Sequence, residues 1–400
     1  MKRLLTTTLL VATLGLNVQA APSPEYDVFM QADNASELSI AYTDLDQFLD
    51  MSVYDVGPST REKADKQSGT TGTRMRNKIN RLTALEGNRF YFDNFDNEKY
   101  VEVLNDLQQS LESLPNEVPL SSFNRNEQLA YWLNLYNFTL LKEMASEHPG
   151  LDMRRLTGDD DDSLRNRKVV TISGVPLSLN DIHFKILKEK YHSDPVVIYG
   201  LFQGVIGGPS IQTEAFTGEK VWRQLERIAK DFVNSNRGTY YDGRLSDYYE
   251  RNLVFFDNDM QKLKDHVLDY LNDDVYQDIV ATDADDLDLD IRDINLAGVG
   301  GGRDFGAGLM TNNAAMIDAA RVEQRGLNAG GGGAMGNGAV QNFVAEGLIQ
   351  KAKLNVRFSP DEISVLKGLR DQHDVAAGKV RVTDLSEDEA KKKEKQKQDQ

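Results

Sequence analysis

Two stretches with helical spacing of apolar residues constrain the fold of this chain more than any other feature of its sequence. In both stretches apolar residues recur every three or four positions, which places them on one face of a helix. The first face contains Leu104, Leu107, Leu111 and Leu114, and the second contains Leu129, Leu133, Tyr136, Leu140 and Met144. Pro115 and Pro119 are expected to end the first helix, and His148-Pro149-Gly150 to end the second. The core of the protein is therefore predicted to be mainly helical.

Short strands are predicted around these helices. Residues 168–172 and 175–177 flank Ser173-Gly174, and residues 239–245 contain Asp242-Gly243, so both segments are typical of β-hairpins. The apolar run of residues 195–202 is predicted to be a buried strand, followed by a glycine-rich turn and then by a helix over about 220–234. The predicted fold class is α+β: a mainly helical domain with a small sheet of short strands and hairpins.

The two ends of the chain differ in composition from the middle. Lys2 and Arg3, an apolar stretch and the small residues before Ala21 are typical of a secretory signal peptide over residues 1–20, cleaved near Ala20. A membrane anchor is the alternative, although the apolar stretch is shorter than the ~20 residues that a spanning helix needs. The remaining predicted divisions are an N-terminal helical and loop extension (21–85), the main domain (86–295), a linker rich in Gly, Ala and Asn (296–340), a small C-terminal element (341–385) and a disordered charged tail (386–400). The expected location is the bacterial periplasm or the medium.

Charge and cysteine content exclude several classes of function. The 400 residues carry a net charge of −17, which repels nucleic acid and anionic lipid. The chain has no cysteine, so disulfides, thiol nucleophiles and thiolate metal sites are excluded. The acidic runs Asp159–Asp162 and Asp283–Asp290 are interpreted as solvated loops, with Ca²⁺ binding as the alternative, because neither has the spacing of a calcium loop. We expect no metal site and no cofactor.

The second helical stretch also carries a resemblance to a known family. Its sequence Asn126-Glu-Gln-Leu-Ala-Tyr-Trp-Leu-Asn-Leu-Tyr-Asn-Phe-Thr-Leu140 resembles the helix motif of the domain-of-unknown-function family 547. Further segments resemble the family in the same order along residues 86–275; they are Leu177–Ile182, Asp194–Leu201, Arg244–Tyr249 and Asp257. The resemblance implies an α+β fold, often exported in bacteria, without an established activity.

The resemblance also implies where chemistry occurs in other members. Many have Ser-Cys-Pro after the buried strand and Ile-Glu-His on the preceding helix, which is the layout of a cysteine nucleophile near an imidazole. In this chain Gly208 stands at the Cys position, His183 at the Glu position and Phe184 at the His position. Thiol chemistry is therefore excluded at this turn.

The remaining polar candidates have both a structural and a functional interpretation. Asn134, Tyr136 and Asn137 either anchor their helix to neighbouring loops or line a pocket, and Gly207 and Gly208 are candidates for a backbone anion site. His183 is either a structural histidine or a general base, and Ser210 is a weak nucleophile candidate without the flanking motif of hydrolases.

Two functions remain open from the sequence. The first is a non-catalytic binding or interaction module for an unknown protein or small molecule. The alternative is a hydrolase-type enzyme with a repurposed pocket near His183 and Ser210. Neither function calls for nucleic acid or for a transmembrane segment after signal removal.

Overall fold

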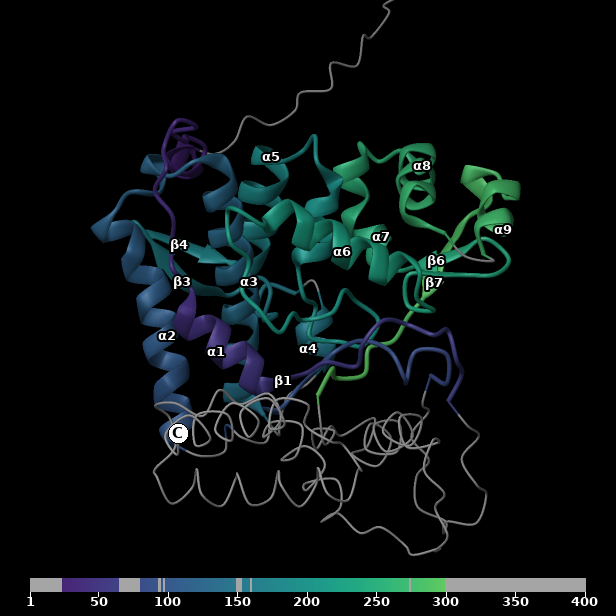
Figure 1. Cartoon of the computed structure of the whole chain (residues 1–400), viewed down its shortest axis with the longest axis horizontal. Coiled ribbons are helices and arrows are strands. Elements are labelled where there is room, and N and C mark those ends of the chain that lie inside the picture. The colour runs from purple at the N-terminus through teal and green to yellow at the C-terminus, as the bar shows by residue number, and fades with distance from the viewer. Residues whose placement is uncertain are drawn as a thin grey trace, which may run out of the picture.

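The computed structural model describes residues 24–64, 80–92, 95, 98–148, 153–158, 160–272 and 275–298. The residues predicted to form the signal peptide, the C-terminal element, the charged tail and all but the start of the linker lie outside this part of the chain. The predicted mainly helical α+β fold is confirmed (Figure 1). Its α-helices are α1 (Thr43–Ser52), α2 (Glu98–Glu117), α3 (Arg125–Glu147), α4 (Met153–Thr157), α5 (Lys188–Lys190), α6 (Val221–Val233), α7 (Tyr248–Asn252), α8 (Met260–Tyr270) and α9 (Tyr276–Ala281).

Helix α3 is the centre of the core. Asn124 caps it, because the Asn124 side chain accepts hydrogen bonds from the backbone N–H groups of Asn126 and Glu127. Residues 127–141 are buried without interruption, so α3 is covered on all sides rather than on one face. It packs against α2 and α6, and α6 in turn packs against α8. In Figure 1, α1 and α2 lie on one side of the molecule and α8 and α9 on the other.

Helix α2 corrects the prediction that Pro115 ends it. The helix continues to Glu117 with Pro115 inside it. A proline removes one backbone N–H and leaves the carbonyl four residues earlier without its helical partner. That carbonyl belongs to Leu111, and the buried hydroxyl of Tyr131 on α3 donates to it at 2.9 Å. A contact with another helix thus supplies the bond that the proline removes.

Within the described residues, the strands are short and form three small sheets. Strands β3 (Lys168–Ile172) and β4 (Val175–Ser178) form the first predicted hairpin, with Ser173 and Gly174 at φ 50° and 81° in its turn. Strands β5 (Thr239–Tyr240) and β6 (Arg244–Ser246) form the second, and β7 (Asp288–Ile291) pairs with β6 in parallel. Strands β1 (Val53–Tyr54) and β2 (Arg89–Phe90) pair in an antiparallel manner. Both hairpin predictions are confirmed.

The predicted strand over residues 195–202 is wrong. Pro195–Gly200 is a buried 3₁₀ helix, η5, followed by the extended residue Leu201. A short buried apolar run fits a strand or a helix equally well, so periodicity alone cannot separate them. Side chains supply several of its backbone partners, since Tyr248 Oη donates to the Ile198 carbonyl at 2.7 Å and Asn137 bonds to Gly200 and Phe202.

The remaining turns of helix connect these elements. They are η1 (Pro24–Phe29), η3 (Leu120–Ser122), η6 (Leu253–Phe256) and η7 (Ala284–Asp286), together with the π-helical η4 (Asp181–Leu187). The N-terminal segment packs into the same core as the rest: the Phe48 ring of α1 lies 5.9 Å from that of Phe90 and 5.3 Å from that of Phe138.

Candidate functional site

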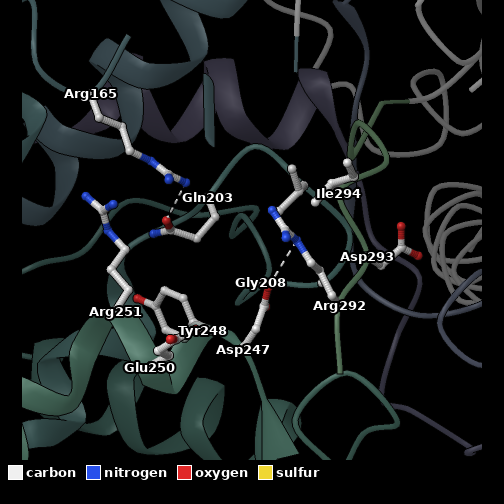
Figure 2. Close-up of a pocket in the computed structure, with 12 residues that line it drawn as sticks. Arg165, Gln203, Gly208, Asp247, Tyr248, Glu250, Arg251, Arg292, Asp293 and Ile294 are labelled. Atoms are coloured by element: carbon white, nitrogen blue, oxygen red, sulfur yellow. Dashed lines mark hydrogen bonds and ion pairs between the residues drawn. The ribbon is translucent and has the colours of Figure 1, made fainter. Parts of the chain in front are cut away.

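A cleft lies beside the Gly207–Gly208 turn. It has a volume of about 400 Å³ and is open to solvent. Its lining residues are Arg165, Gln203, Val205, Gly207, Gly208, Asp247, Tyr248, Glu250, Arg251, Arg292, Asp293 and Ile294. Figure 2 shows Arg165 and Arg251 on one side of the cleft and Arg292 on the other.

The backbone of the turn is fixed by the segment that follows β7. The N–H groups of Ile206 and Gly207 donate to the carbonyls of Asn295 and Asp293, each at 2.9 Å. These two N–H groups are therefore already bonded, which removes them from the backbone anion site considered for this turn. Gly207 and Gly208 both line the cleft with their backbone atoms, because glycine has no side chain.

Gly208 has a packing role that depends on its lack of a side chain. A Cβ atom at this position would lie 2.9 Å from both Cβ and Cγ of Gln203. The Gln203 side chain thus occupies the space into which a residue at position 208 would project. Gln203 Oε1 accepts a hydrogen bond of 2.8 Å from Arg165, whose residue is only 5% exposed. The glycine makes room for the residue that holds Arg165 in place.

The other two arginines are held by different contacts. Arg251 donates to Asn180 Oδ1, and its guanidinium lies 5.1 Å from the centre of the Phe184 ring, within the range of a cation–π contact. Arg292 is the most exposed of the three and forms an ion pair of 3.3 Å with Asp247. Each of the three arginines thus has at least one contact with a neighbouring side chain.

The charged residues of the cleft change the pKa of neighbouring carboxyl groups. Burial raises the pKa of the Asp247 carboxyl, Glu250 raises it further by repulsion, and Arg292 and Arg165 oppose the increase. Asp293 contributes to the lining but its side chain points away from the cleft (Figure 2), where it accepts hydrogen bonds from Thr83 and Asn295. Burial raises the pKa of Asp293 as well.

His183 lies behind the cleft rather than in it. It is fully buried, its ring stacks on Phe184, and its Nε2 lies 2.8 Å from Asn252 Oδ1. The Asn252 amide nitrogen donates to the Tyr248 carbonyl, so the oxygen faces the histidine and Nε2 carries the proton. Burial lowers the pKa of His183 well below its usual value, with Arg251 and Arg165 adding to the effect. A neutral ring sealed among aromatic side chains has no access to a substrate.

The two asparagines of α3 bond to backbone. Asn134 makes a pair of 2.8 Å hydrogen bonds with Phe216, and Asn137 bonds to the Gly200 carbonyl at 2.8 Å and the Phe202 N–H at 2.9 Å. The cavity beside them holds about 10 Å³, the space of roughly one water molecule. Tyr136 is buried with its ring edge against His183. This geometry matches the anchoring interpretation and leaves no room for a ligand.

Ser210 faces a different cleft. That cleft has a volume of about 210 Å³ and lies between the Asp55–Pro58 loop and α6. The Ser210 hydroxyl oxygen accepts hydrogen bonds from Arg237 at 3.1 Å and from the Asn88 N–H at 3.3 Å. No histidine is among the lining residues of this cleft in the described part of the chain. Asn137, His183 and Ser210 therefore lie in three separate environments.

One comparison with known proteins identifies the central region. Residues 120–233 match the model of a family described as "Protein of unknown function, DUF547". The chain contains a DUF547 domain. No curated protein and no solved structure matches this chain. Within the described residues, no helix is long and apolar enough to cross a membrane.

The arginine cleft lies across the end of the matched region. Arg165, Gln203, Gly207 and Gly208 belong to the DUF547 match, whereas Arg251 and Arg292 follow it in sequence. The cleft is therefore built jointly by the DUF547 domain and by residues 234–298. Sequence reasoning did not find its arginines, because they are scattered along the chain and belong to no motif.

A buried charge cluster beneath the turn was also missed. Arg237 is 1% exposed; it donates to the Gly208 carbonyl at 2.8 Å and lies 3.7 Å from the buried Glu86 carboxylate. Glu86 in turn accepts from the N–H groups of Asn236 and Arg237. The cluster ties the segment before β2 to the turn of the DUF547 domain. In the described part of the chain no three His, Asp or Glu residues are grouped so that they could hold a metal ion.

Proposed function

We propose that this chain is an exported binding protein whose arginine cleft holds a small anionic ligand without making or breaking covalent bonds. The observation that carries the proposal is the convergence of Arg165, Arg251 and Arg292 on one cleft of about 400 Å³. A planar guanidinium binds carboxylate and phosphate groups through paired hydrogen bonds, so several of them in a concave site favour an anion. Ligand sites of small molecules have volumes of this order.

The lining of the cleft does not supply the groups of the hydrolase alternative. Among its twelve residues, all in the described part of the chain, there is no Ser, Thr or His, and the whole chain lacks Cys. A serine or cysteine nucleophile activated by histidine is therefore absent from this lining. The hydrolase alternative required His183 and Ser210 in one pocket, and their separate environments remove its support.

The two positions at which the family resemblance implies chemistry now serve the arginines. Gly208, at the Cys position, leaves the space that Gln203 fills, and Gln203 holds Arg165. Phe184, at the His position, lies beneath the guanidinium of Arg251. Both departures from the family pattern therefore have a structural consequence at the same cleft, which supports a change from bond-making to binding.

A single introduced thiol can measure the potential in the cleft. The chain has no cysteine, so Ile294→Cys at the exposed rim would carry the only thiol in the protein. Iodoacetate and iodoacetamide alkylate the same thiolate, and only the first is an anion, so the ratio of their rates reports the local potential independently of the thiol pKa. A positive potential of about one to two kT raises this ratio roughly 3- to 7-fold above that of the unfolded chain.

The controls separate the cleft from the rest of the surface. The ratio is expected to fall in Arg165→Gln, Arg251→Gln and the more exposed Arg292→Gln, and to stay unchanged in Arg227→Gln, which lines the other cleft. High salt should reduce it by screening. A ratio equal to that of the unfolded chain, or one that all three cleft variants leave unchanged, would refute the proposal.

Export is a separate part of the proposal. It rests on the signal-peptide pattern of residues 1–20. Mass spectrometry of the protein from a bacterial periplasm or medium should give an N-terminus at Ala21. Recovery of the protein only from the cytoplasm with Met1 retained would contradict export and leave the binding proposal untouched.

A further inference from the structure

The second cleft, of about 210 Å³ between the Asp55–Pro58 loop and α6, shares no lining residue with the arginine cleft. Asn88 joins two of its walls, because its Oδ1 accepts from the Val56 N–H at 3.0 Å and its Nδ2 donates to the Ile211 carbonyl at 2.8 Å. The amide of Asn88 thus holds the walls together within the protein. Contacts with a ligand are left to the other lining residues.

Two hydroxyl groups of this lining are available as donors. Ser210 Oγ accepts hydrogen bonds from Arg237 and from the Asn88 N–H, so both of its lone pairs are used, and its proton has no acceptor among the described residues. A hydroxyl group that accepts from a guanidinium is polarised, which strengthens the bond that its own proton makes. Thr213 forms no hydrogen bond within the described part of the chain. Both hydroxyl groups therefore have a proton for a ligand.

The charged groups of the second cleft leave one carboxylate unbalanced. Asp231 forms an ion pair of 3.2 Å with Arg237. Arg227 forms one of 3.0 Å with Glu214. Asp55 has no cationic partner among the described residues. An anion in the cleft would be repelled by this carboxylate, whereas a hydroxyl group can donate a hydrogen bond to it.

We infer that the second cleft binds a single-ring sugar without a negative charge. The hydroxyl groups of the sugar accept from Ser210 and Thr213 and donate to Asp55, since a hydroxyl group is both a donor and an acceptor. Ile228 supplies apolar surface for the C–H groups of the ring. The volume of about 210 Å³ is below the ~300 Å³ at which sites for drug-sized molecules begin, so it fits one ring rather than a chain of rings.

The test uses a thiol at the rim of the second cleft. Pro58 is exposed and lines the cleft, so Pro58→Cys gives the full chain a single thiol there. Its alkylation by iodoacetamide is measured with D-glucose, D-galactose and D-mannose, with the uronate of each, and again in the unfolded chain. At least one sugar is expected to slow alkylation of the folded chain alone, and its uronate to need at least ~10-fold higher concentration because of repulsion by Asp55.

Variants assign the contacts of the sugar. Thr213→Val removes one donor without breaking a hydrogen bond inside the described part of the protein, and it should raise the concentration for half-maximal protection roughly 2- to 10-fold. Thr171→Val is the matched control, at an exposed position of β3 that does not line the cleft, and should leave that concentration unchanged. Asp55→Asn should remove the disadvantage of the uronate, because the amide carries no charge.

The inference is overturned if none of the three sugars protects the folded chain more than the unfolded chain at ~100 mM. Equal protection by a sugar and its uronate would also overturn it, as would protection that Thr213→Val leaves unchanged. Circular dichroism of each variant checks that the fold is retained. These results do not depend on the iodoacetate preference at Ile294→Cys, which tests the arginine cleft, so each proposal can fail without the other.

Discussion

Truncation of Asn137 tests whether the distinctive amides of α3 anchor the core. The Asn137 side chain donates to the Gly200 carbonyl at 2.8 Å and accepts from the Phe202 N–H at 2.9 Å. Both backbone groups belong to the buried segment at the end of η5. Asn137→Ala removes both bonds and leaves both groups in the interior without these partners.

The cost follows from the number of groups left behind. A buried donor or acceptor without a partner costs about 1–3 kcal/mol, so two of them lower the free energy of unfolding by roughly 2–6 kcal/mol. A water that entered the space left by the amide would bring the value toward the lower bound. The loss should appear as a lower denaturant midpoint with an unchanged m-value, because the fold itself is retained.

Urea unfolding followed by circular dichroism gives the measurement, and Asn126→Ala provides the matched control. Asn126 lies on the same helix and accepts a hydrogen bond of 2.8 Å from Trp222, but at the surface. Its truncation should cost at most about 1 kcal/mol, because water replaces the lost partner. If Asn137→Ala were no more destabilising than Asn126→Ala, the anchoring role would be refuted.

Three further predictions follow from buried groups. Burial lowers the pKa of His266 to about 4, so the unfolded chain binds a proton first as pH falls from 6.5 to 4, and stability decreases by up to about 3 kcal/mol over that range; His266→Phe should flatten this decrease in urea titrations across pH. Burial raises the pKa of the Glu86 carboxyl, so the folded chain binds this proton before the unfolded chain does, and the free energy of unfolding increases as pH falls toward the pKa of the unfolded chain. Glu86→Gln should lose this increase. An equal pH dependence of the free energy of unfolding in the variant and the parent protein would contradict the shift. Gly208→Ala should displace Gln203 and release Arg165, so the iodoacetate preference at Ile294→Cys should fall while the far-ultraviolet circular dichroism stays unchanged.

Local pattern was enough for those parts of the fold that depend on neighbours in sequence. The hairpins at Ser173-Gly174 and Asp242-Gly243 were predictable because the turn residues themselves adopt positive φ. The extent of α2 was not, because the bond that compensates for Pro115 comes from Tyr131 on another helix. The helical conformation of residues 195–200 could not be predicted for the same reason, because side chains far away in sequence form hydrogen bonds with several of the backbone groups of residues 195–202.

The candidate site divides in the same way. The family motif led to the Gly207–Gly208 turn, and the turn does line the arginine cleft. Two polar residues that stood out in the sequence, Asn134 and His183, are buried and form hydrogen bonds within the core. The residues that face the cleft could not be chosen from the sequence, because a chain with 46 lysines and arginines gives no sign of which three converge.

The net charge of the chain and the charge of its cleft point to different partners, and the difference is physically consistent. A net charge of −17 is a property of the whole surface and is screened beyond about 10 Å at ordinary salt. Within a concave site, the nearest groups dominate the potential that a small ligand experiences. A large polyanion such as nucleic acid meets the outer field and is repelled, whereas a small ligand can lie within the cleft. At the proposed binding site such a ligand experiences mainly the charges of the cleft lining, because the distant acidic residues contribute little.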